Sequence, residues 1–232
     1  MSEGKAAVPQ HLGLIIDGNR RWAHMQRLPI SEGHRRGYLN VRTIAAAAMR
    51  RGIRYLSAYV FSTENWKRDE QEVRDLMKLL SWVLKHEVKQ LHKEGIRLRV
   101  AGSRVRLGVA MVRAILHAED MTKDNTRGTL LLCLDYGGQQ EIVDAVKRIA
   151  ASGIEPDEIT PELITHHLYA PDVPAPDLII RTSGEQRLSN FMLWGSAYSE
   201  LAFPEKNWPD FTEEDLDGIL ADYAARHRRF GK

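Results

Sequence analysis

The chain has 232 residues, of which 43% are hydrophobic and 28% charged, so it can bury a sizeable core and fold as one domain without a structural metal. Its 33 basic and 31 acidic residues leave a formal net charge of +2, which argues against nucleic-acid binding through overall charge. The single cysteine, Cys133, excludes an internal disulfide, and no apolar stretch reaches the roughly 18 residues of a membrane-spanning helix. These features predict a soluble, cytoplasmic protein.

Short apolar runs recur along the chain, each bounded by glycine, proline or charged residues. They predict buried strands at residues 12–16, 55–61, 96–101, 130–134 and 178–180. Most are separated by helix-length segments with apolar residues at helical spacing, at 38–51, 70–93, 109–121, 139–151 and 212–226. This alternation predicts an α/β fold with a mostly parallel sheet covered by helices on both faces, whose ligands bind beyond the carboxyl ends of the strands.

The first apolar run ends in Asp17, Gly18 and Asn19, which lead into a predicted helix. Free backbone N–H groups at a helix start bind phosphate, and Gly18 permits close backbone approach. The carboxylate of Asp17 would repel an anion there unless a divalent cation lay between them, and hard oxygen ligands favour Mg²⁺. The same residues are also typical of a tight turn with an Asp or Asn helix cap, so this segment alone leaves both interpretations open.

A second polar segment, residues 181–190, directly follows another predicted strand. Arg181 and Arg187 suit diphosphate oxygens because a guanidinium forms bidentate, charge-assisted hydrogen bonds, and Ser189 adds a hydroxyl. An exposed loop with solvated charges explains the same residues equally well.

A third polar segment, residues 59–68, ends the strand predicted at 55–61. Its polar groups can orient a substrate beside the apolar wall of Trp66. Alternatively, Ser62 or Thr63 caps a helical turn and Trp66 packs on the core.

All three segments follow strands of one predicted parallel sheet, so we expect their polar groups to meet at a single edge. The chain contains neither GxxxxGK[ST] nor GxGxxG, which leaves a nucleotide-hydrolysing or dinucleotide-binding site without its usual support. Its histidines show no zinc-binding spacing. Two anion-binding segments and one metal-binding carboxylate instead suggest two diphosphate ligands held side by side.

Six motifs occur in order along the chain, at residues 17–23, 33–34, 61–66, 136–138, 181–191 and 194–200. As a set they resemble the signature regions of cis-prenyltransferases, the undecaprenyl diphosphate synthase-like family, over nearly the whole chain. The resemblance implies a flexible N-terminus at residues 1–10 and one catalytic domain at residues 11–232. That domain would have a central, mostly parallel six-stranded sheet flanked by helices, with a hydrophobic tunnel.

The resemblance also implies a Mg²⁺-dependent, homodimeric transferase that condenses isopentenyl diphosphate with an allylic diphosphate such as farnesyl diphosphate. Each new double bond would be Z, and the product would be a polyprenyl diphosphate such as undecaprenyl diphosphate, through which the protein would associate peripherally with a membrane. We expect the apolar helix at 72–88 and the strand at 130–134 to wall the tunnel. No nucleic-acid partner is expected.

Carried over residue by residue, the resemblance gives catalytic roles to Asp17, Ser62 and Asn65. It gives Mg²⁺ coordination to Asp17 and Glu200. The allylic diphosphate would be held by Gly18, Asn19, Arg21 and His34, and isopentenyl diphosphate by Arg181, Arg187 and Ser189. The other substrate-binding positions that it implies are Trp22, Ser62, Thr63, Glu64, Asn65, Trp66, Arg68 and Glu72.

The sequence departs from the family pattern at two positions. Ile30 stands where the family often has an arginine that contacts the allylic diphosphate, and Gln186 replaces a histidine that sometimes assists the metal. Residues 229–231 resemble a tail that reaches the neighbouring subunit's active site. Two alternatives remain: a non-catalytic partner subunit of a cis-prenyltransferase complex, and a phosphatase-like α/β protein. Retention of Asp17 argues against the first.

Overall fold

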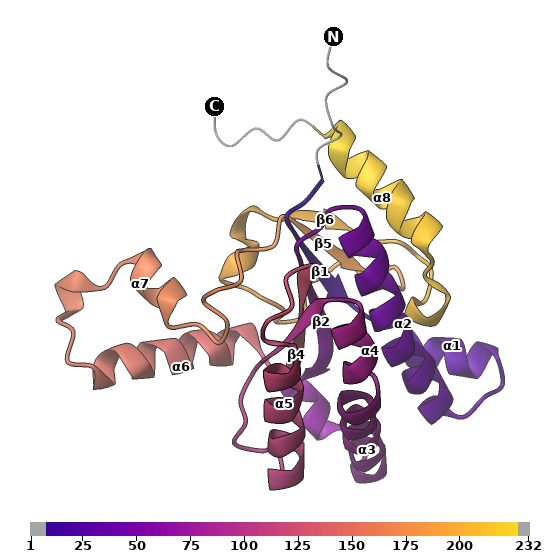
Figure 1. The fold of residues 1–232 in the computed structure, drawn as a ribbon, viewed down its shortest axis with the longest axis horizontal. Helices are drawn as coiled ribbons and strands as arrows, with labels where there is room; N and C mark the ends of the chain where they lie inside the picture. Colours follow the sequence, from indigo (N-terminus) through magenta and orange to yellow (C-terminus); the bar gives the residue numbers. More distant parts are fainter. Residues whose placement is uncertain (1–7, 227–232) are drawn as a thin grey trace.

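A six-stranded sheet forms the centre of the computed structural model, which describes residues 8–226 (Figure 1). The strands lie in the order β3-β4-β2-β1-β5-β6, and every pairing between them is parallel. Their bounds are β1 His11–Ile15, β2 Tyr55–Ser62, β3 Ile96–Ala101, β4 Gly128–Tyr136, β5 Leu178–Arg181 and β6 Glu200–Ala202. The expected α/β fold with a six-stranded sheet is confirmed, and the sheet is wholly parallel in the part of the chain described.

The five strands predicted from apolar runs are all present, because central parallel strands are buried on both faces and read as continuous apolar sequence. All nine residues of β4 are buried. The sixth strand, β6, was not predicted as a segment, since it is a three-residue edge strand whose Leu201 is 36% exposed. Such a strand leaves too short an apolar signal to read.

Eight α-helices flank the sheet in the described chain. They are α1 Asn19–Met25, α2 Ile30–Arg50, α3 Glu70–His86, α4 Val88–Lys93, α5 Val109–Thr122, α6 Gly138–Ala151, α7 Pro161–His166 and α8 Glu213–Ala225. Figure 1 shows α6 and α7 projecting away from the sheet as an arm. Between residues 8 and 226, none of the helices has the length and apolar character to cross a bilayer.

Three helix predictions differ from the structure. The second helix starts at Ile30, not at residue 38, directly after Pro29, which can precede a helix but not continue one. The helix predicted at 70–93 is divided at Glu87 into α3 and α4. The short helix α7, capped by Thr160, was missed. Residues 1–7 and 229–231, which carry the predicted flexible N-terminus and the tail motif, lie outside the described residues.

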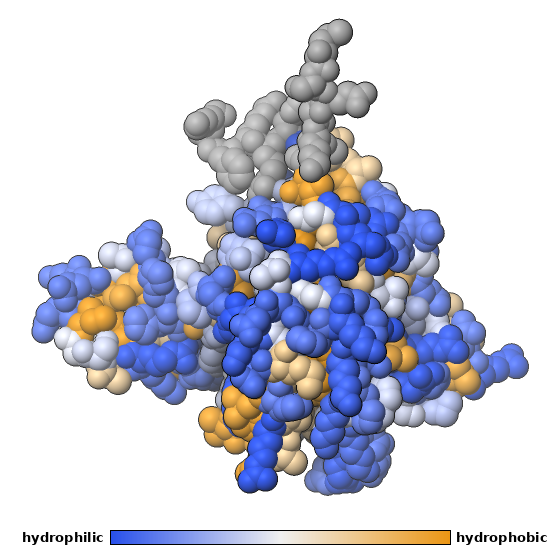
Figure 2. Space-filling view, in the orientation of Figure 1, coloured by the Kyte–Doolittle hydropathy of each residue, from blue (hydrophilic) through white to orange (hydrophobic). Residues whose placement is uncertain are grey.

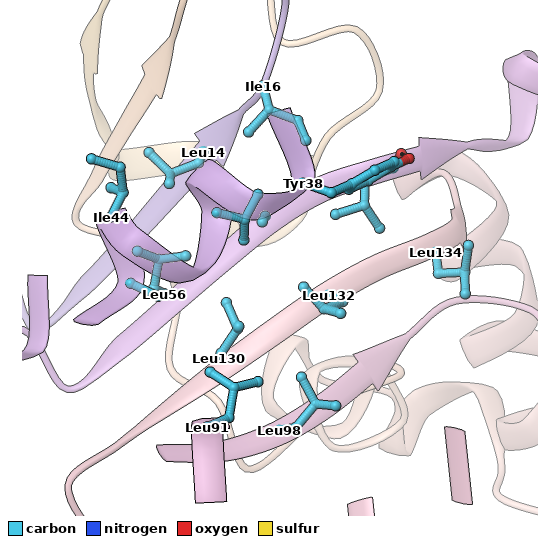
Figure 3. Close-up of a cluster of buried hydrophobic side chains, with 14 of the residues drawn as sticks. Leu14, Ile16, Tyr38, Ile44, Leu56, Leu91, Leu98, Leu130, Leu132 and Leu134 are labelled. Carbon is cyan, nitrogen blue, oxygen red and sulfur yellow. Dashed lines mark hydrogen bonds between the residues drawn. The ribbon is translucent and has the colours of Figure 1, made fainter. Parts of the chain in front are cut away.

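The main core lies between the sheet and the helices on one of its faces. Figure 3 shows Leu14 of β1 and Leu56 of β2 beside Ile44 of α2, and all three are buried. Fully burying a side chain of this size contributes about 1.5–3 kcal/mol to the free energy of unfolding. The core therefore holds α2 against β1 and β2, the strands whose carboxyl ends carry the first and third polar segments.

A small apolar cavity of about 30 Å³ lies inside this core. It is lined by Leu80, Val83 and Leu84 of α3 and by Leu130, Leu132 and Leu134 of β4, among others. Both segments expected to wall a hydrocarbon tunnel thus contribute to one cavity. The only charged residues that line it are Arg42 and Glu87, whose side chains form an ion pair with Nε and Oε2 3.0 Å apart.

Two helical glycines give a matched test of how tightly α1 packs on α2. A Cβ on Gly33 of α2 would lie 2.3 Å from the backbone oxygen of Asn19, whereas a Cβ on Gly218 of α8 would meet no atom within 4 Å. We expect Gly33→Ala to lower the free energy of unfolding by about 1–3 kcal/mol and Gly218→Ala to raise it by about 0.5–1 kcal/mol. Urea denaturation measures both, and equal effects would contradict the close packing.

Candidate active site

The loops after β1, β2 and β5 meet at the carboxyl edge of the sheet. Ile15 of β1 pairs with Tyr59 of β2 on one side and with Arg181 of β5 on the other. A cleft of about 530 Å³ opens there, lined by Ile15, Ile16, Asp17, Tyr59, Ser62, Glu64, Asn65, Arg68, Arg181, Ser189 and Asn190. The structure therefore brings together the three polar segments that the sequence placed at strand ends.

A buried arginine organises the floor of this cleft. Arg181 donates through Nη2 to Asp17 Oδ2 at 2.8 Å, and through Nη1 to Ser189 Oγ and to the carbonyl oxygen of Arg187, both at 2.6 Å. The whole residue is buried, and its Nε has no hydrogen-bond partner in the described chain. Because a buried guanidinium needs a counter-charge, Asp17 and Arg181 stabilise each other at the join of β1 and β5.

Asp17 is ionised in this setting. Partial burial acts to raise the pKa of its carboxyl group, but the hydrogen bond and positive charge of Arg181 outweigh burial and lower the pKa below its usual value. The Gly18 N–H, 2.7 Å from Oδ1, and Arg21, with Nη2 3.5 Å from Oδ1, act in the same direction. The cleft therefore carries a carboxylate at neutral pH.

The loop after β2 supplies the second wall. Asn65 Oδ1 accepts a hydrogen bond from the Ser62 backbone N–H at 2.9 Å, which closes the first turn after the strand. Glu64 accepts from Nδ2 of Asn190 at 3.0 Å, tying this wall to the loop after β5. Burial raises the pKa of Glu64, but this hydrogen bond and others nearby lower it overall. The predicted helix-capping turn and the predicted polar site are one and the same structure.

The loop after β5 has an unusual backbone. Ser183, Ser189, Asn190 and Met192 all have φ between 42° and 76°, the left-handed region that non-glycine residues seldom adopt. Such conformations persist only where the surroundings enforce them, and they concentrate at functional sites. Here the strain directs Ser189 Oγ to Arg181 and Asn190 to Glu64.

A second cavity, of about 560 Å³, adjoins the cleft between α2 and α3, and its lining includes Arg20, Ile30, His34 and Glu72. Arg68 connects the two, because it lines the cleft and donates to Glu72 Oε1 at 3.0 Å. Arg20 and His34 lie 3.7 Å and 3.5 Å from the same carboxylate. Ile30, the departure from the family pattern, places an apolar side chain in the lining of this cavity. Arg20 and Arg35 line it together with the carboxylates of Glu32, Asp69, Glu72 and Asp75.

Burial holds His34 neutral. Loss of hydration, followed by the positive charge of Arg68, lowers its pKa to about 4, against the opposing effect of Glu72. His34 is 7% exposed, and its buried ring nitrogen Nε2 has no hydrogen-bond partner in the described chain. At neutral pH His34 is thus an uncharged group in the lining of the second cavity, beside the Glu72 carboxylate.

Seven predicted substrate-binding residues line neither cavity: Gly18, Asn19 and Arg21, which lie at the rim of the cleft, and Trp22, Thr63, Trp66 and Arg187. Trp22 is 4% exposed and its indole N–H donates to Asp210 at 2.7 Å, so it is a core residue. The indole N–H of Trp66 donates to Asp135 at 2.7 Å, which matches the alternative of packing on the core. Thr63 faces Gly137, and the guanidinium of Arg187 turns to Glu185, 2.5 Å away. Trp22 and Trp66 therefore each have a hydrogen-bond partner within the chain, and substrate contact by either residue stays a prediction.

The residues after Asp17 shape the rim. Gly18 has φ of 101°, and a Cβ there would lie 2.4 Å from Asn207 Oδ1, so only glycine fits. Asn19 donates to the Ile16 carbonyl oxygen at 3.3 Å. Arg21 reaches the Ser183 carbonyl oxygen at 3.2 Å and remains half-exposed beside the cleft.

The structure does not bring Glu200 to the cleft, which corrects its predicted pairing with Asp17 within one chain. Glu200 is in register with Leu178 at the amino end of β5, whereas Arg181 and Asp17 lie at the carboxyl ends of the strands, roughly 10 Å further on. Its carboxylate instead binds Arg226, with Nη1 2.7 Å from Oε2. Across the described residues, no group of three His, Cys, Asp or Glu side chains forms a metal site.

Sequence reasoning did not single out several residues of the two cavities, and three of these lie in or beside the motifs. Tyr59 and Asn190 line the cleft, and Arg20 lines the second cavity. All three lie inside the quoted motifs or next to them, so the signal was present. Only the register of β2 with β1 and the strained loop after β5 show that their side chains face the same space.

This parallel α/β fold carries a polar cleft and a second cavity beyond the carboxyl ends of its strands, which is where enzymes of this fold class bind their ligands. A family model described as "Putative undecaprenyl diphosphate synthase" matches residues 15–231. The chain therefore belongs to the undecaprenyl diphosphate synthase family, the cis-prenyltransferases, and it is a prenyltransferase.

Relatives of known name align with this chain over most of their own lengths. An isoprenyl transferase of Clostridium perfringens is 46% identical over 97% of this chain and 90% of its own, and a decaprenyl diphosphate synthase of Mycobacterium leprae is 45% identical over 97% and 78%. The crystal structure of lavandulyl diphosphate synthase from Lavandula x intermedia, in complex with dimethylallyl diphosphate, superposes with a TM-score of 0.93 at 37% identity, covering 97% of this chain and 99% of that one.

The neutral histidines predict a pH dependence of stability. His11 is also buried, and burial lowers its pKa to about 4. An unfolded histidine binds a proton near pH 6.5 but the folded one only near pH 4, so acid favours the unfolded chain. The resulting stability is complete above about pH 6.5 and is lost as the pH falls towards 4.

Urea denaturation between pH 4 and 7 measures this slope. Together the two histidines make the free energy of unfolding depend on pH between about 4 and 6.5. His34→Gln is expected to remove roughly half of this dependence and to leave the part that His11 contributes. NMR titration should show that the His34 ring stays neutral down to about pH 5. An unchanged slope in the variant would contradict the assignment.

Proposed function

We propose that this protein is a Z-isoprenyl diphosphate synthase that condenses isopentenyl diphosphate with an allylic diphosphate and repeats the step to make a polyprenyl diphosphate. The observation that carries the proposal is the Asp17–Arg181 pair at the floor of a cleft whose Arg68 donates a hydrogen bond to Glu72 of a second cavity. Two adjoining sites of this kind suit a reaction between two diphosphates.

The cleft suits isopentenyl diphosphate. Arg181, Arg68 and Ser189 present donors to it, and Arg forms charge-assisted hydrogen bonds with diphosphate oxygens. Arg187 remains a candidate only if its side chain leaves Glu185 when a diphosphate binds. Ser62 Oγ and the amide nitrogen of Asn65 lie on the facing wall, where we propose that they orient the reacting carbon chain.

The second cavity suits the allylic diphosphate. Arg20, Arg35 and His34 line it together with four carboxylates, and Gly18, Asn19 and Arg21 lie on the adjoining loop and helix α1. Glu72 holds Arg68, Arg20 and His34 in place from the centre. The neutral His34 ring would donate or accept one hydrogen bond there without adding charge.

The donor set fits Mg²⁺, which proteins usually bind through one or two carboxylates together with substrate phosphates and water. Asp17 is an ionised carboxylate in a cleft with basic walls, and it would hold the ion against a diphosphate. When bound, the ion stabilises negative charge as a diphosphate leaves. Glu200 could join it only from another chain, because within one chain it lies at the other end of β5.

The residues of the chain account for the rest of the catalysis. As the allylic C–O bond breaks, negative charge grows on the departing diphosphate. Arg20 in the second cavity and Arg68 beside it stabilise that charge because they are already in place. Apolar Ile15 and Ile16 limit the access of water to the developing carbocation. We propose that the catalytic domain comprises residues 11–232. We also propose that the reaction takes place in the cytoplasm.

We also propose a homodimer that forms over an apolar groove of about 550 Å³ between α6, α7 and the loop that follows β5. Tyr198 at its edge is 83% exposed, and Val143 and Val146 on α6 are also exposed. Figure 2 shows hydrophobic surface on the projecting arm of α6 and α7. A second copy of the chain would cover this surface.

The alternative, a non-catalytic partner subunit, is not favoured, because such subunits have no need of an ionised Asp17 held by Arg181. Purified protein, isopentenyl diphosphate labelled with ¹⁴C, farnesyl diphosphate and Mg²⁺ test the proposal directly. Extended prenyl diphosphates are the expected products. Their absence, with and without other divalent ions, would refute the enzymatic assignment.

Asp17→Asn tests the cleft in the same assay. The amide keeps an acceptor for Arg181 but loses the charge, so turnover is expected to fall roughly 100-fold or more while the thermal melt stays close to wild type. Asp120→Asn is the matched control, since Asp120 is an exposed carboxylate on α5. Similar activity in both variants would show that Asp17 holds no metal.

Product length depends on the apolar cavity behind the site. At about 30 Å³ it must widen to hold a hydrocarbon, and each buried CH₂ then contributes about 0.8 kcal/mol. Because Arg42 and Glu87 are its only charged lining residues, Arg42→Ala is expected to shift the products to longer chains on thin-layer chromatography. Arg50→Ala, which removes the same charge elsewhere on α2, should leave the lengths unchanged.

A further inference from the structure

Helices α3 and α4 carry a surface that the proposed chemistry does not use. From Trp82 to Lys93 every exposed side chain is basic, histidine or tryptophan: Trp82, Lys85, His86, Lys89, His92 and Lys93. Glu87, within this stretch, and Glu94, just after it, are partly buried and lie 3.0 Å and 3.8 Å from Arg42. Both carboxylates therefore turn away from the surface towards a basic partner.

Three of these exposed residues and Lys78, an exposed residue one turn earlier on α3, form one line. Lys78, Trp82, Lys85 and Lys89 are spaced i, i+4, i+7 and i+11, which places them on a single face of a helix. The line continues from α3 into α4 because Glu87 keeps helical dihedrals and donates to the Val83 carbonyl oxygen. We call these four residues the basic face. Figure 2 shows hydrophilic surface over α3 and α4.

The basic face differs from an ordinary solvated helix face in two respects. Such faces usually mix charges of both signs, yet the nearest exposed carboxylate here is Asp75, 3.7 Å from Lys78 at one end. Trp82 is 42% exposed in the middle of the line, and its ring stacks on His86 with centroids 4.9 Å apart. An exposed, ordered indole between lysines is the arrangement that membrane interfaces favour.

We propose that the basic face docks the protein onto the surface of a bilayer that contains anionic lipids. Lysines near such a surface are attracted to its negative potential, and tryptophan partitions into the headgroup region. Four residues on one side of a folded protein give reversible, salt-sensitive attachment without any spanning segment. We infer an anionic bilayer as the partner because the lysines complement its negative charge and Trp82 suits its headgroup region.

The position of the face explains its use. The opposite side of α3 supplies Leu80, Val83 and Leu84 to the apolar cavity, so one helix, about 10 Å thick, separates that cavity from the bilayer. A polyprenyl product would need to travel only this distance to reach lipid. This purpose rests on the proposed function, whereas lipid binding itself does not.

Vesicle sedimentation tests the proposal. Wild-type protein is expected to bind vesicles of phosphatidylglycerol and phosphatidylcholine, to bind pure phosphatidylcholine far more weakly, and to detach as salt is raised. Lys78→Gln/Lys85→Gln/Lys89→Gln should weaken binding roughly fivefold per lysine, or about 100-fold in total. Arg54→Gln/Lys123→Gln/Lys147→Gln removes the same charge at exposed sites elsewhere and should bind like wild type.

Tryptophan fluorescence gives a second readout. Of the five tryptophans in the chain, Trp82 is the one on this face, so vesicles should shift the emission of wild type to the blue but not that of Trp82→Phe. Equal binding by the two triple variants, or a blue shift that survives in Trp82→Phe, would overturn the proposal. So would stronger binding to an acidic protein or to RNA than to vesicles.

The chain-elongation assay, run with soluble short substrates, separates the two proposals. The lysine variant is expected to keep wild-type turnover in detergent solution, because its substitutions lie outside the site. Vesicle binding without any extension product would refute the proposed function and leave the docking surface standing. Extension products without vesicle binding would refute the docking surface and leave the proposed function standing.

Discussion

The ion pair between Asp17 and Arg181 is the constraint on which the site depends. Parallel pairing of β1 with β5 places a carboxylate and a guanidinium at one strand end, where burial would make either charge costly alone. Their mutual stabilisation keeps Asp17 ionised at neutral pH and fixes Arg181 with one nitrogen, Nε, still unpaired. The cleft is thus prepared for a further anion and a cation before either binds.

Helix α3 links the main parts of the molecule. At its start, Glu72 gathers Arg20, Arg68 and His34 between the two cavities. In its middle, apolar side chains wall the cavity behind the site, and on its outer side it carries the basic face. Substrate binding, chain accommodation and product delivery would therefore respond together to a shift of this one helix.

The two tryptophans of the motifs show what motif position leaves undecided. Trp22 and Trp66 stand next to residues of the site, so motif position suggested that they contact substrate. The structure directs the Trp66 indole to the buried carboxylate of Asp135 and the Trp22 indole to the exposed residue Asp210. A large aromatic residue near a site contributes more by fixing the backbone that carries its neighbours, and adjacency in sequence cannot distinguish that from contact.

The sequence by itself determined the five long strands, most helices and the clustering of Asp17, Ser62 and Arg181, because burial of apolar runs and the edge rule for parallel sheets are local or general properties. The tertiary structure alone decided that Glu200 lies far from Asp17, that His34 is neutral and that Tyr59 and Asn190 face the cleft. These depend on strand order, register and the desolvation that distant segments impose. Periodicity along a chain records which residues are buried, but not which segment buries them.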